Sequence, residues 1–237
     1  MKKELSVVIP AYNEEEQIES TVESVTAYFR RKGYKFELLI VNDGSTDSTL
    51  ERVRGLEKRL PEVRVVDLGK NYGKGYAVKE GMAHAHFAYS LFMDADNATS
   101  IREWDKFETF LESGARAVIA SRRLPASKIV HPQPMVRRFL GGGYRKLSRS
   151  LFGLNVSDLN CGFKAYETAL AKKIYSQVRL LDWAFDTEVF CLLKKEGVRI
   201  DEVPVTWEHR EKKSNLAPFR VGFLTLGSLW RLKRSYR

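Results

Sequence analysis

Residues 36–47 read FELLIVNDGSTD, an apolar run that ends in a polar turn. The run predicts a buried β-strand over residues 36–41, because a strand covered on both faces is apolar throughout and does not alternate. The turn that follows, with Asn42, Asp43 and Gly44, is typical of a strand end. The stretch therefore predicts one strand of a sheet that is covered on both sides.

The same alternation continues on both sides of this stretch. We expect strands at 5–10, 36–41, 63–67, 89–93 and 117–120, and helices at 14–31, 47–59 and 75–85. Strands that alternate with helices predict a mostly parallel, doubly wound, Rossmann-like α/β sheet. Ligands of such sheets bind beyond the carboxyl ends of the strands. We therefore expect the site where polar clusters follow the strands.

The second half of the chain is less regular. Residues 122–135 contain three prolines and predict a mobile loop. A basic helix is expected over about 136–151, and a further strand near 203–207. At 237 residues, the chain suits one large α/β domain better than two.

The formal net charge is +10 at pH 7. This excess favours an anionic partner, which is a nucleic acid, an anionic membrane or a phosphorylated substrate. Only two cysteines occur, Cys161 and Cys191, so we expect no disulfide framework and a reducing, cytosolic setting. The sequence shows no signal-peptide pattern and no apolar run near the roughly 20 residues of a membrane span. We therefore expect a soluble or peripheral protein.

Two carboxylates, Asp94 and Asp96, follow the fourth predicted strand. At a strand end they can point the same way and share a hard divalent cation, and Mg²⁺ or Mn²⁺ prefers such oxygen ligands and bridges readily to a diphosphate. Alternatively, residues 96–100 only cap the next helix. Their position at the ligand-binding edge of the sheet favours the metal site.

Two other polar turns are expected at the same edge. Asp43 either accepts hydrogen bonds from the base or ribose of a nucleotide or caps a tight turn, and both can hold together. Residues 70–75, KNYGKG, offer glycines for close backbone approach and lysines for phosphate. Their glycine spacing is not that of a P-loop.

Four motifs follow one another at these strand ends: residues 8–14 (VIPAYNE), 42–47 (NDGSTD), 71–75 and 94–96. They resemble the successive motifs of family-2 inverting glycosyltransferases with the GT-A fold. Residues 158–164 and 183–188 resemble the polyprenyl-phosphate branch, especially the dolichyl-phosphate glucosyltransferases, with the mannose synthases close behind. The resemblance implies a GT-A domain over 1–218, with a nucleotide-sugar half at 1–121 and an acceptor half at 122–218. A basic amphipathic segment would follow at 219–237.

The resemblance also implies roles for particular residues. The nucleotide sugar would be held by Pro10, Tyr12, Glu14, Asp43, Lys74 and Asp94. The metal ligands would be Asp94 and Asp96, and the groups acting at the donor sugar or diphosphate would be Asp96, Arg122, Asp186 and Glu188. The acceptor phosphate would be held by Arg137, Arg138 and Lys213. In place of the Ser-Lys pair that is usual after the last strand of the family, this chain has Lys212, Lys213 and Ser214.

The expected acceptor is a polyprenyl phosphate. A sugar hydroxyl needs a general base, whereas a lipid monophosphate, with a second pKa near about 6, is already largely ionised at neutral pH and needs cations instead. The basic helix with Arg137 and Arg138 fits this need, although a solvated charged face gives the same pattern. Near the C-terminus, apolar residues stand among arginines and lysines: Phe219, Phe223, Leu226, Leu229 and Trp230. This segment either forms an amphipathic helix in the membrane interface or packs on the body with a basic tail. We expect a peripheral protein on the cytoplasmic face of a membrane.

UDP-glucose is the donor that the resemblance favours, because Ala98 stands where mannose synthases usually place glutamine. The alternatives are a GDP-mannose-dependent polyprenyl-phosphate mannosyltransferase and a family-2 enzyme that acts on a polysaccharide hydroxyl. A non-enzymatic basic module that binds nucleic acid or a membrane would not need Asp94 and Asp96. No nucleic-acid-binding motif occurs, so no nucleic-acid partner is expected.

Overall fold

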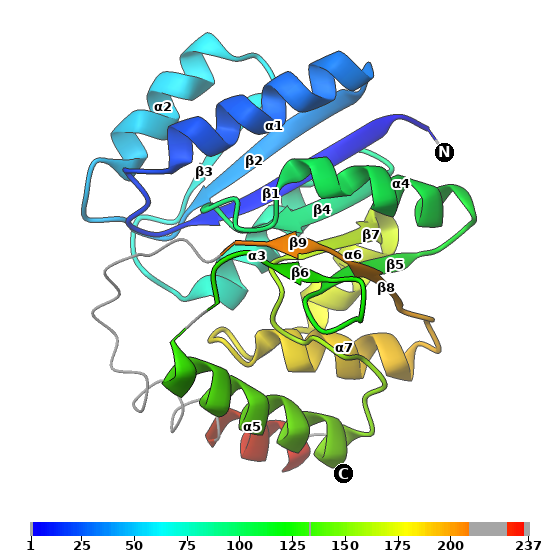
Figure 1. Cartoon of the computed structure of the whole chain (residues 1–237). Helices are drawn as coiled ribbons and strands as arrows, with labels where there is room; N and C mark the ends of the chain where they lie inside the picture. Colours follow the sequence, from blue (N-terminus) through cyan, green and yellow to red (C-terminus); the bar gives the residue numbers. More distant parts are fainter. Residues whose placement is uncertain (1, 133, 209–226, 235–237) are drawn as a thin grey trace.

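The computed structural model describes residues 2–132, 134–208 and 227–234 (Figure 1). Its main element is a seven-stranded sheet in the order β3-β2-β1-β4-β7-β5-β8. The strands are β1 (Glu4–Ala11), β2 (Lys35–Asn42), β3 (Val63–Asp67), β4 (Tyr89–Met93), β5 (Ala117–Ser121), β7 (Phe163–Glu167) and β8 (Asp201–Pro204). Neighbours pair in parallel, except that β7 runs antiparallel to β4 and β5. The predicted mostly parallel α/β sheet is confirmed.

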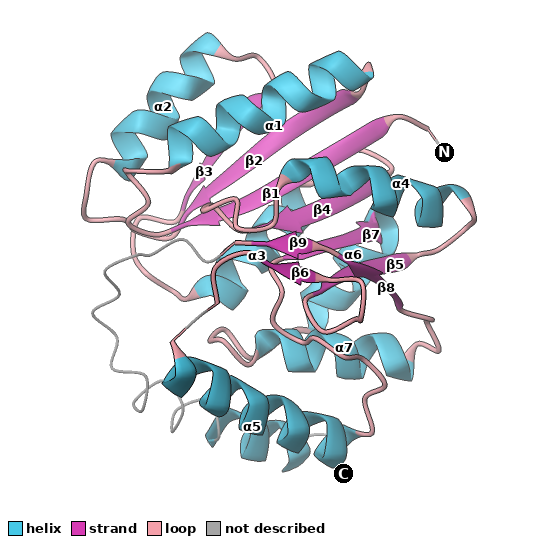
Figure 2. Ribbon diagram, viewed as in Figure 1, coloured by secondary structure: helices cyan, strands magenta, loops and turns pink. Residues whose placement is uncertain are grey.

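Helices cover both faces of the sheet (Figure 2). One face is packed by α1 (Ile18–Lys32), α2 (Thr49–Arg59) and α4 (Trp104–Glu112). The other is packed by α3 (Lys74–His84), α6 (Thr168–Gln177) and α7 (Phe185–Lys195). The first three predicted helices correspond to α1, α2 and α3, with boundaries shifted by a few residues.

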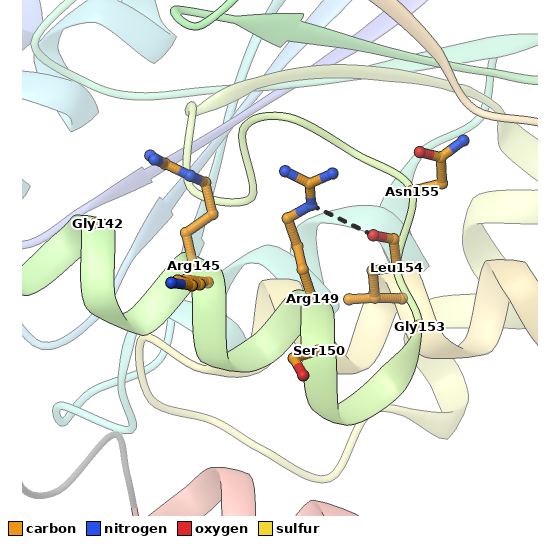
Figure 3. A pocket seen from close by; sticks show the side chains of 8 residues that line it. Gly142, Arg145, Arg149, Ser150, Gly153, Leu154 and Asn155 are labelled. Carbon is orange, nitrogen blue, oxygen red and sulfur yellow. Dashed lines mark hydrogen bonds between the residues drawn. The ribbon is translucent and has the colours of Figure 1, made fainter.

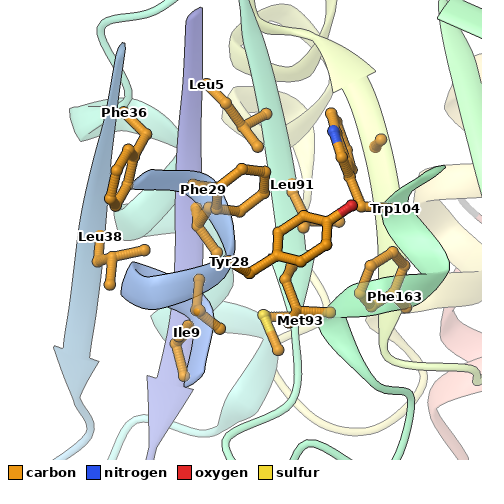
Figure 4. Close-up of a cluster of buried hydrophobic side chains, with 14 of the residues drawn as sticks. Leu5, Ile9, Tyr28, Phe29, Phe36, Leu38, Leu91, Met93, Trp104 and Phe163 are labelled. Carbon is orange, nitrogen blue, oxygen red and sulfur yellow. The ribbon is translucent and has the colours of Figure 1, made fainter. Parts of the chain in front are cut away.

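Aromatic side chains fill the layer between the sheet and helices α1 and α4 (Figure 4). Phe29 of α1 lies edge-on to Trp104 of α4, with ring centroids 5.9 Å apart. The Trp104 indole is fully buried, and its Nε1 donates to Tyr34 Oη at 3.1 Å. Truncating such a buried aromatic typically lowers stability by about 3–5 kcal/mol. This layer therefore stabilises the strands whose ends carry the candidate site.

Strand β7 is the main difference from the sequence-based expectation, because residues 163–167 were not predicted as a strand. It comes from the second half of the chain but lies between β4 and β5, so the two expected halves share one sheet. The strand expected near 203–207 is split into β8 and β9 (Thr206–Trp207). β9 pairs in parallel with β6 (Lys128–Ile129), which lies inside the segment expected to be a loop.

Helix α5 (Met135–Phe152) lies outside the two helical layers and confirms the predicted basic helix (Figure 1). Its Tyr144 Oη lies 2.6 Å from Thr187 Oγ1, which ties α5 to α7. The C-terminal residues 227–234 are helical. Leu229 and Leu232 are buried, whereas Trp230 is 65% exposed, so the described part of the expected amphipathic segment packs on the body through one side only; Phe219, Phe223 and Leu226 lie outside the described residues. In the described ranges, no helix has the length and apolar character to cross a membrane.

Candidate active site

The turns after β1 and β2 are joined by hydrogen bonds. Asn13 has a left-handed backbone (φ 55°), and its Oδ1 accepts from the backbone N–H of Thr46 at 2.8 Å. The backbone N–H of Glu14 donates to Thr49 Oγ1 at 2.7 Å. These bonds bring together two of the polar clusters that the sequence placed at one edge. Pro10 lies at the end of β1, and Tyr12, 43% exposed, presents its ring at this edge.

Asp43 joins this edge to the start of α3. Its two carboxylate oxygens accept from the backbone N–H groups of Tyr72 and Gly73, at 2.7 and 2.9 Å. Burial raises the pKa of Asp43, and the two backbone donors act in the opposite direction. Asp43 therefore fixes the residues before α3 and does not cap its own turn, in which Asn42 Oδ1 accepts from the backbone N–H of Ser45 at 3.3 Å. Contact of Asp43 with a nucleotide stays a prediction.

The glycines of residues 70–75 make their close approach to the chain itself. A Cβ at Gly73 would lie 2.5 Å from the carbonyl oxygen of Leu181, and one at Gly75 would lie 2.7 Å from Phe185 Cβ. The backbone N–H of Gly75 donates to that same Leu181 oxygen at 2.9 Å. The close backbone approach expected at these glycines is therefore made to residues 181–185, and Lys74 reaches the carboxylate of Asp94. A contact of the lysines with phosphate stays a prediction.

Asp94 lies directly after β4, under the turn that precedes β7. Its backbone N–H donates to the carbonyl oxygen of Gly162 at 3.0 Å. A Cβ at Gly162 would lie 2.0 Å from Asp94 Oδ2, so only glycine leaves room for this carboxylate. On the open side, Lys74 Nζ donates to Asp94 Oδ1 at 2.6 Å.

Asp96 also stabilises its own turn. Its Oδ1 accepts from the backbone N–H of Ala98 at 2.9 Å, and the helix that follows is capped by Ser100, whose Oγ accepts from the backbone N–H of Arg102 at 3.4 Å. The residue after it, Asn97, has a left-handed backbone (φ 51°). Both carboxylates of the pair therefore belong to one short turn at the end of β4.

The donor set fits a cation that arrives with a substrate. In the part of the chain that the structure describes, no group of three or more His, Cys, Asp or Glu side chains is arranged to hold a metal ion. Mg²⁺ is commonly bound through one or two carboxylates together with substrate phosphates, and it keeps several waters. Asp94 and Asp96 match that pattern, so we retain them as the proposed metal ligands.

A second ion pair lies behind Asp94. Lys164, in the middle of β7, is fully buried and donates to Asp186 in the first turn of α7 and to the carbonyl oxygen of Leu159. Burial raises the pKa of Asp186, and the charge of Lys164 opposes this rise. Sequence analysis gave no role to Lys164, because only the fold brings it to Asp186.

Glu188 does not share the environment of Asp186, because its side chain contacts the backbone before α7. Residues two apart on a helix do not face each other, and the Oε2 atom of Glu188 accepts from the backbone N–H groups of Arg179 and Leu180, at 2.9 and 2.7 Å. These bonds hold the turn in front of α7. A direct role of Glu188 at the donor sugar therefore stays a prediction, and the structure shows a supporting one.

Arg122, just after β5, is held by Asp158. Its Nε and Nη2 atoms donate to the two carboxylate oxygens at 2.7 and 2.9 Å, and its guanidinium lies 5.3 Å from the centre of the Trp207 ring. Burial alone would raise the pKa of Asp158, but Arg122 outweighs it and holds that pKa below its ordinary value. The motif at residues 158–164 pointed to this region, but not to the pairing.

Three other arginines gather between β5 and α5. Burial, followed by the charge of Arg145, lowers the pKa of Arg123; Asp158 opposes this, and Arg122 and Arg138 add to it. Within the described residues, no carboxylate forms an ion pair with Arg123, Arg138 or Arg145. We call these three residues the arginine cluster. The side chain of Arg137 and the whole of Lys213 lie outside what the structure describes.

A cavity of about 600 Å³ continues from Arg145 along α5 (Figure 3). Arg145 and Arg149 lie one turn apart and leave the same face of the helix, and Arg149 Nε donates to the carbonyl oxygen of Leu154 at 3.4 Å. The cavity lining also includes Lys146 and Asn155. This face of α5 is therefore suited to an anionic ligand.

Solved structures share this architecture. Mannosyl-3-phosphoglycerate synthase from Rubrobacter xylanophilus aligns with a TM-score of 0.75 at 18% identity, over 98% of this chain and 74% of its own. Glucosyl-3-phosphoglycerate synthase from Mycobacterium tuberculosis, solved with Mn²⁺, UDP-glucose and phosphoglyceric acid, aligns with a TM-score of 0.69 at 18% identity, over 97% and 79%. The fold is that of the GT-A glycosyltransferases.

The sequence comparison identifies the family. The model of Glycosyl transferase family 2 matches residues 6–175, so the chain belongs to this family and is a glycosyltransferase. It is 33% identical to a dolichyl-phosphate beta-glucosyltransferase of Drosophila melanogaster, over 91% of this chain and 70% of that protein. It is 30% identical to the enzyme of the same name from Dictyostelium discoideum, over 97% and 77%.

Proposed function

We propose that this chain transfers glucose, with inversion, from UDP-glucose to a polyprenyl phosphate at a membrane surface. The relatives that share 30–33% of its sequence over most of its length support the sugar and the lipid class. The structural observation that carries the acceptor class is the arginine cluster of Arg123, Arg138 and Arg145.

The arginine cluster matches a phosphate group. The charges of Arg145 and Arg138 act against that of Arg123, Asp158 offsets this only in part, and none of the three forms an ion pair with a carboxylate of the described residues. Guanidinium groups present planar pairs of donors that fit phosphate oxygens. A phosphate bound among them removes the repulsion and gains charge-assisted hydrogen bonds. The acceptor is therefore anionic at the atom that reacts.

An ionised phosphate needs no general base. Its second pKa is about 6, so at neutral pH the attacking oxygen already carries charge. A hydroxyl acceptor needs a group that removes its proton. Asp186 is engaged by Lys164, and Glu188 by two backbone N–H groups, so neither carboxylate is arranged as such a base. The site favours a phosphate acceptor over a polysaccharide hydroxyl.

The donor lies at the carboxyl ends of β1, β2 and β4 in this proposal. Pro10, Tyr12, Glu14 and Asp43 border the nucleotide. Asp94 and Asp96 hold Mg²⁺ or Mn²⁺, which supplies positive charge against the departing diphosphate. Lys74 adds a further cation, and Arg122, fixed by Asp158, keeps its orientation without rearrangement when the donor binds.

The N-terminal turns of α5 support a membrane surface as the place where this chain acts. Met135 and Phe139 are 81% and 83% exposed, and the helix also carries Arg138, Lys146 and Arg149. Apolar side chains next to basic ones suit the interface of an anionic membrane, where the apolar groups enter the acyl region and the cations meet the headgroups. We place the protein peripherally on the cytoplasmic face.

A donor and acceptor matrix tests the proposal. The purified chain is incubated with radiolabelled UDP-glucose or GDP-mannose and with polyprenyl phosphate or the matching polyprenol, with Mn²⁺ or with a chelator. We expect label in the organic phase only for UDP-glucose, polyprenyl phosphate and Mn²⁺ together. Label from GDP-mannose would favour the mannosyltransferase, and equal use of the polyprenol would contradict the phosphate acceptor.

A further inference from the structure

Lys74 forms an ion pair with Asp94, the carboxylate that the metal is expected to bind. Its Nζ lies 2.6 Å from Asp94 Oδ1, and the rings of Trp183 and Phe92 lie 4.9 and 5.4 Å away. Lys74 is therefore paired with Asp94, one of the two proposed metal ligands.

The other side of Asp94 is covered. Gly162 presses against its carboxyl group so closely that a single added carbon would overlap it. Access to the carboxylate is therefore from the face away from Gly162, and Lys74 already donates to its Oδ1. A divalent cation that binds Asp94 meets a positive charge already in place, and like charges in a partly buried site repel strongly.

The neighbouring ion pair limits where Lys74 can go. Asp186 already faces Lys164, so it is compensated and offers Lys74 little replacement for Asp94. Lysine is a point charge on a flexible four-carbon stem, which lets it change partners with small movements of the backbone. A diphosphate bound to the same metal would give Lys74 a new anionic partner within its reach.

We propose that Lys74 exchanges partners as the donor binds: it neutralises Asp94 in the absence of metal, and it turns to the diphosphate when a divalent cation takes Asp94. This rests on the proposed function, because the second partner is the diphosphate of the nucleotide sugar. The exchange makes Lys74 a positioning residue that couples the two ligands. Metal alone leaves Lys74 without its anion, whereas metal and nucleotide together satisfy every charge, so each ligand raises the affinity for the other by the same factor.

Binding of Mn²⁺ tests the exchange without any turnover. Free Mn²⁺ is measured by electron paramagnetic resonance in titrations of the whole chain, with and without UDP, for the wild type, Lys74→Met and Lys74→Arg. We expect Lys74→Met to bind Mn²⁺ about tenfold more tightly without UDP and, with Mn²⁺ present, to bind UDP about tenfold more weakly. Lys74→Arg keeps the charge and should retain the weak binding of Mn²⁺ alone.

Lys58→Met is the matched control, since it removes one exposed positive charge from α2 and should change neither affinity. If Lys74→Met binds UDP more weakly but leaves Mn²⁺ affinity without UDP unchanged, Lys74 is only a phosphate ligand and the exchange is wrong. If the wild type binds Mn²⁺ and UDP independently of each other, the coupling is wrong while the donor site stands. If the wild type does not bind UDP at all, the proposed function fails together with the exchange.

Discussion

The carboxylates of Asp94 and Asp186 and the arginine cluster beside α5 carry opposite charges, and they differ in whether the fold already supplies a charged partner. Asp94 and Asp186 each accept from a lysine, and their positions are fixed before any ligand binds. Arg123, Arg138 and Arg145 form no ion pair with a carboxylate of the described residues, and the charges of Arg145 and Arg138 act against that of Arg123. The first region is thus a preformed cradle whose cation can be exchanged, whereas the second is an unpaired group of cations that an anionic ligand would stabilise. Substitutions should therefore act on different steps in the two regions.

Asp96→Asn should have the largest effect. It removes one of the two charges facing the metal, and an amide oxygen can still accept from the backbone N–H of Ala98, so the turn should survive. We expect transfer to fall by about a thousandfold or more, as for loss of a main electrostatic group. Single-turnover assays over a range of Mn²⁺ concentrations measure this, with circular dichroism as the check on folding. Near-normal transfer with unchanged metal dependence would rule out Asp96 as a ligand.

Gly162→Ala should damage the same region through packing alone. The added carbon would lie 2.0 Å from Asp94 Oδ2, so the carboxylate or the turn before β7 must move. We expect a loss of about 1–3 kcal/mol in the free energy of unfolding, together with weaker Mn²⁺ binding. Gly141→Ala is the control, because an added Cβ there meets no atom within 4 Å. Equal stability and equal metal affinity in the two variants would show that the tight contact at Gly162 is unimportant.

Arg138→Ala should act on the acceptor and spare the donor. Loss of one charge-assisted hydrogen bond to phosphate costs about 1.5–3 kcal/mol, so the KM for polyprenyl phosphate should rise about 10- to 100-fold. The KM for the nucleotide sugar should stay within a factor of two or so, because the donor cradle is intact. Arg102→Ala removes an exposed arginine near α4 and is the control. A collapse of donor affinity instead would mean that the cluster belongs to the donor site.

Phe139→Ser should have the smallest effect, and it concerns only the membrane. The side chain is 83% exposed, so its replacement leaves the core intact. Partial burial of one phenylalanine in the interface contributes roughly 1 kcal/mol, so binding to anionic liposomes should fall about fivefold. Cosedimentation at low and high salt measures this, since salt weakens the attraction of the basic residues. Unchanged liposome binding would show that the tip of α5 does not enter the membrane.

The sequence predicted the regular elements well where the pattern is local. Strands β3 and β4 have the predicted boundaries, because apolar residues predominate in each and polar residues follow. Strand β7, FKAYE, was missed because it is short and carries charged residues, one of which, Lys164, is fully buried. A charged residue argues against a buried strand unless its partner is known, and that partner, Asp186, lies on another element.

For the candidate site, too, the sequence predicted what depends on local pattern and missed what depends on tertiary contacts. The position of Asp94 and Asp96 follows from the strand that precedes them. The partners of Lys74, Arg122 and Asp186 depend on tertiary contacts between distant segments, which no local pattern contains. The glycines at 73 and 75 show the limit most clearly, since the sequence indicates a close backbone approach there but not that the approach is to residues 181–185.

The order of strands also governs how this chain can fold while it is being synthesised. β5 pairs only with β7 and β8 among the described strands, and both are later in the sequence. A nascent chain that ends after residue 121 therefore exposes an apolar strand with no neighbour. At about 5–20 residues per second, β7 follows only after a delay of some seconds. The strands of the first half therefore cannot complete the sheet until β7 has been synthesised. A chaperone that covers β5 would be most useful during that interval.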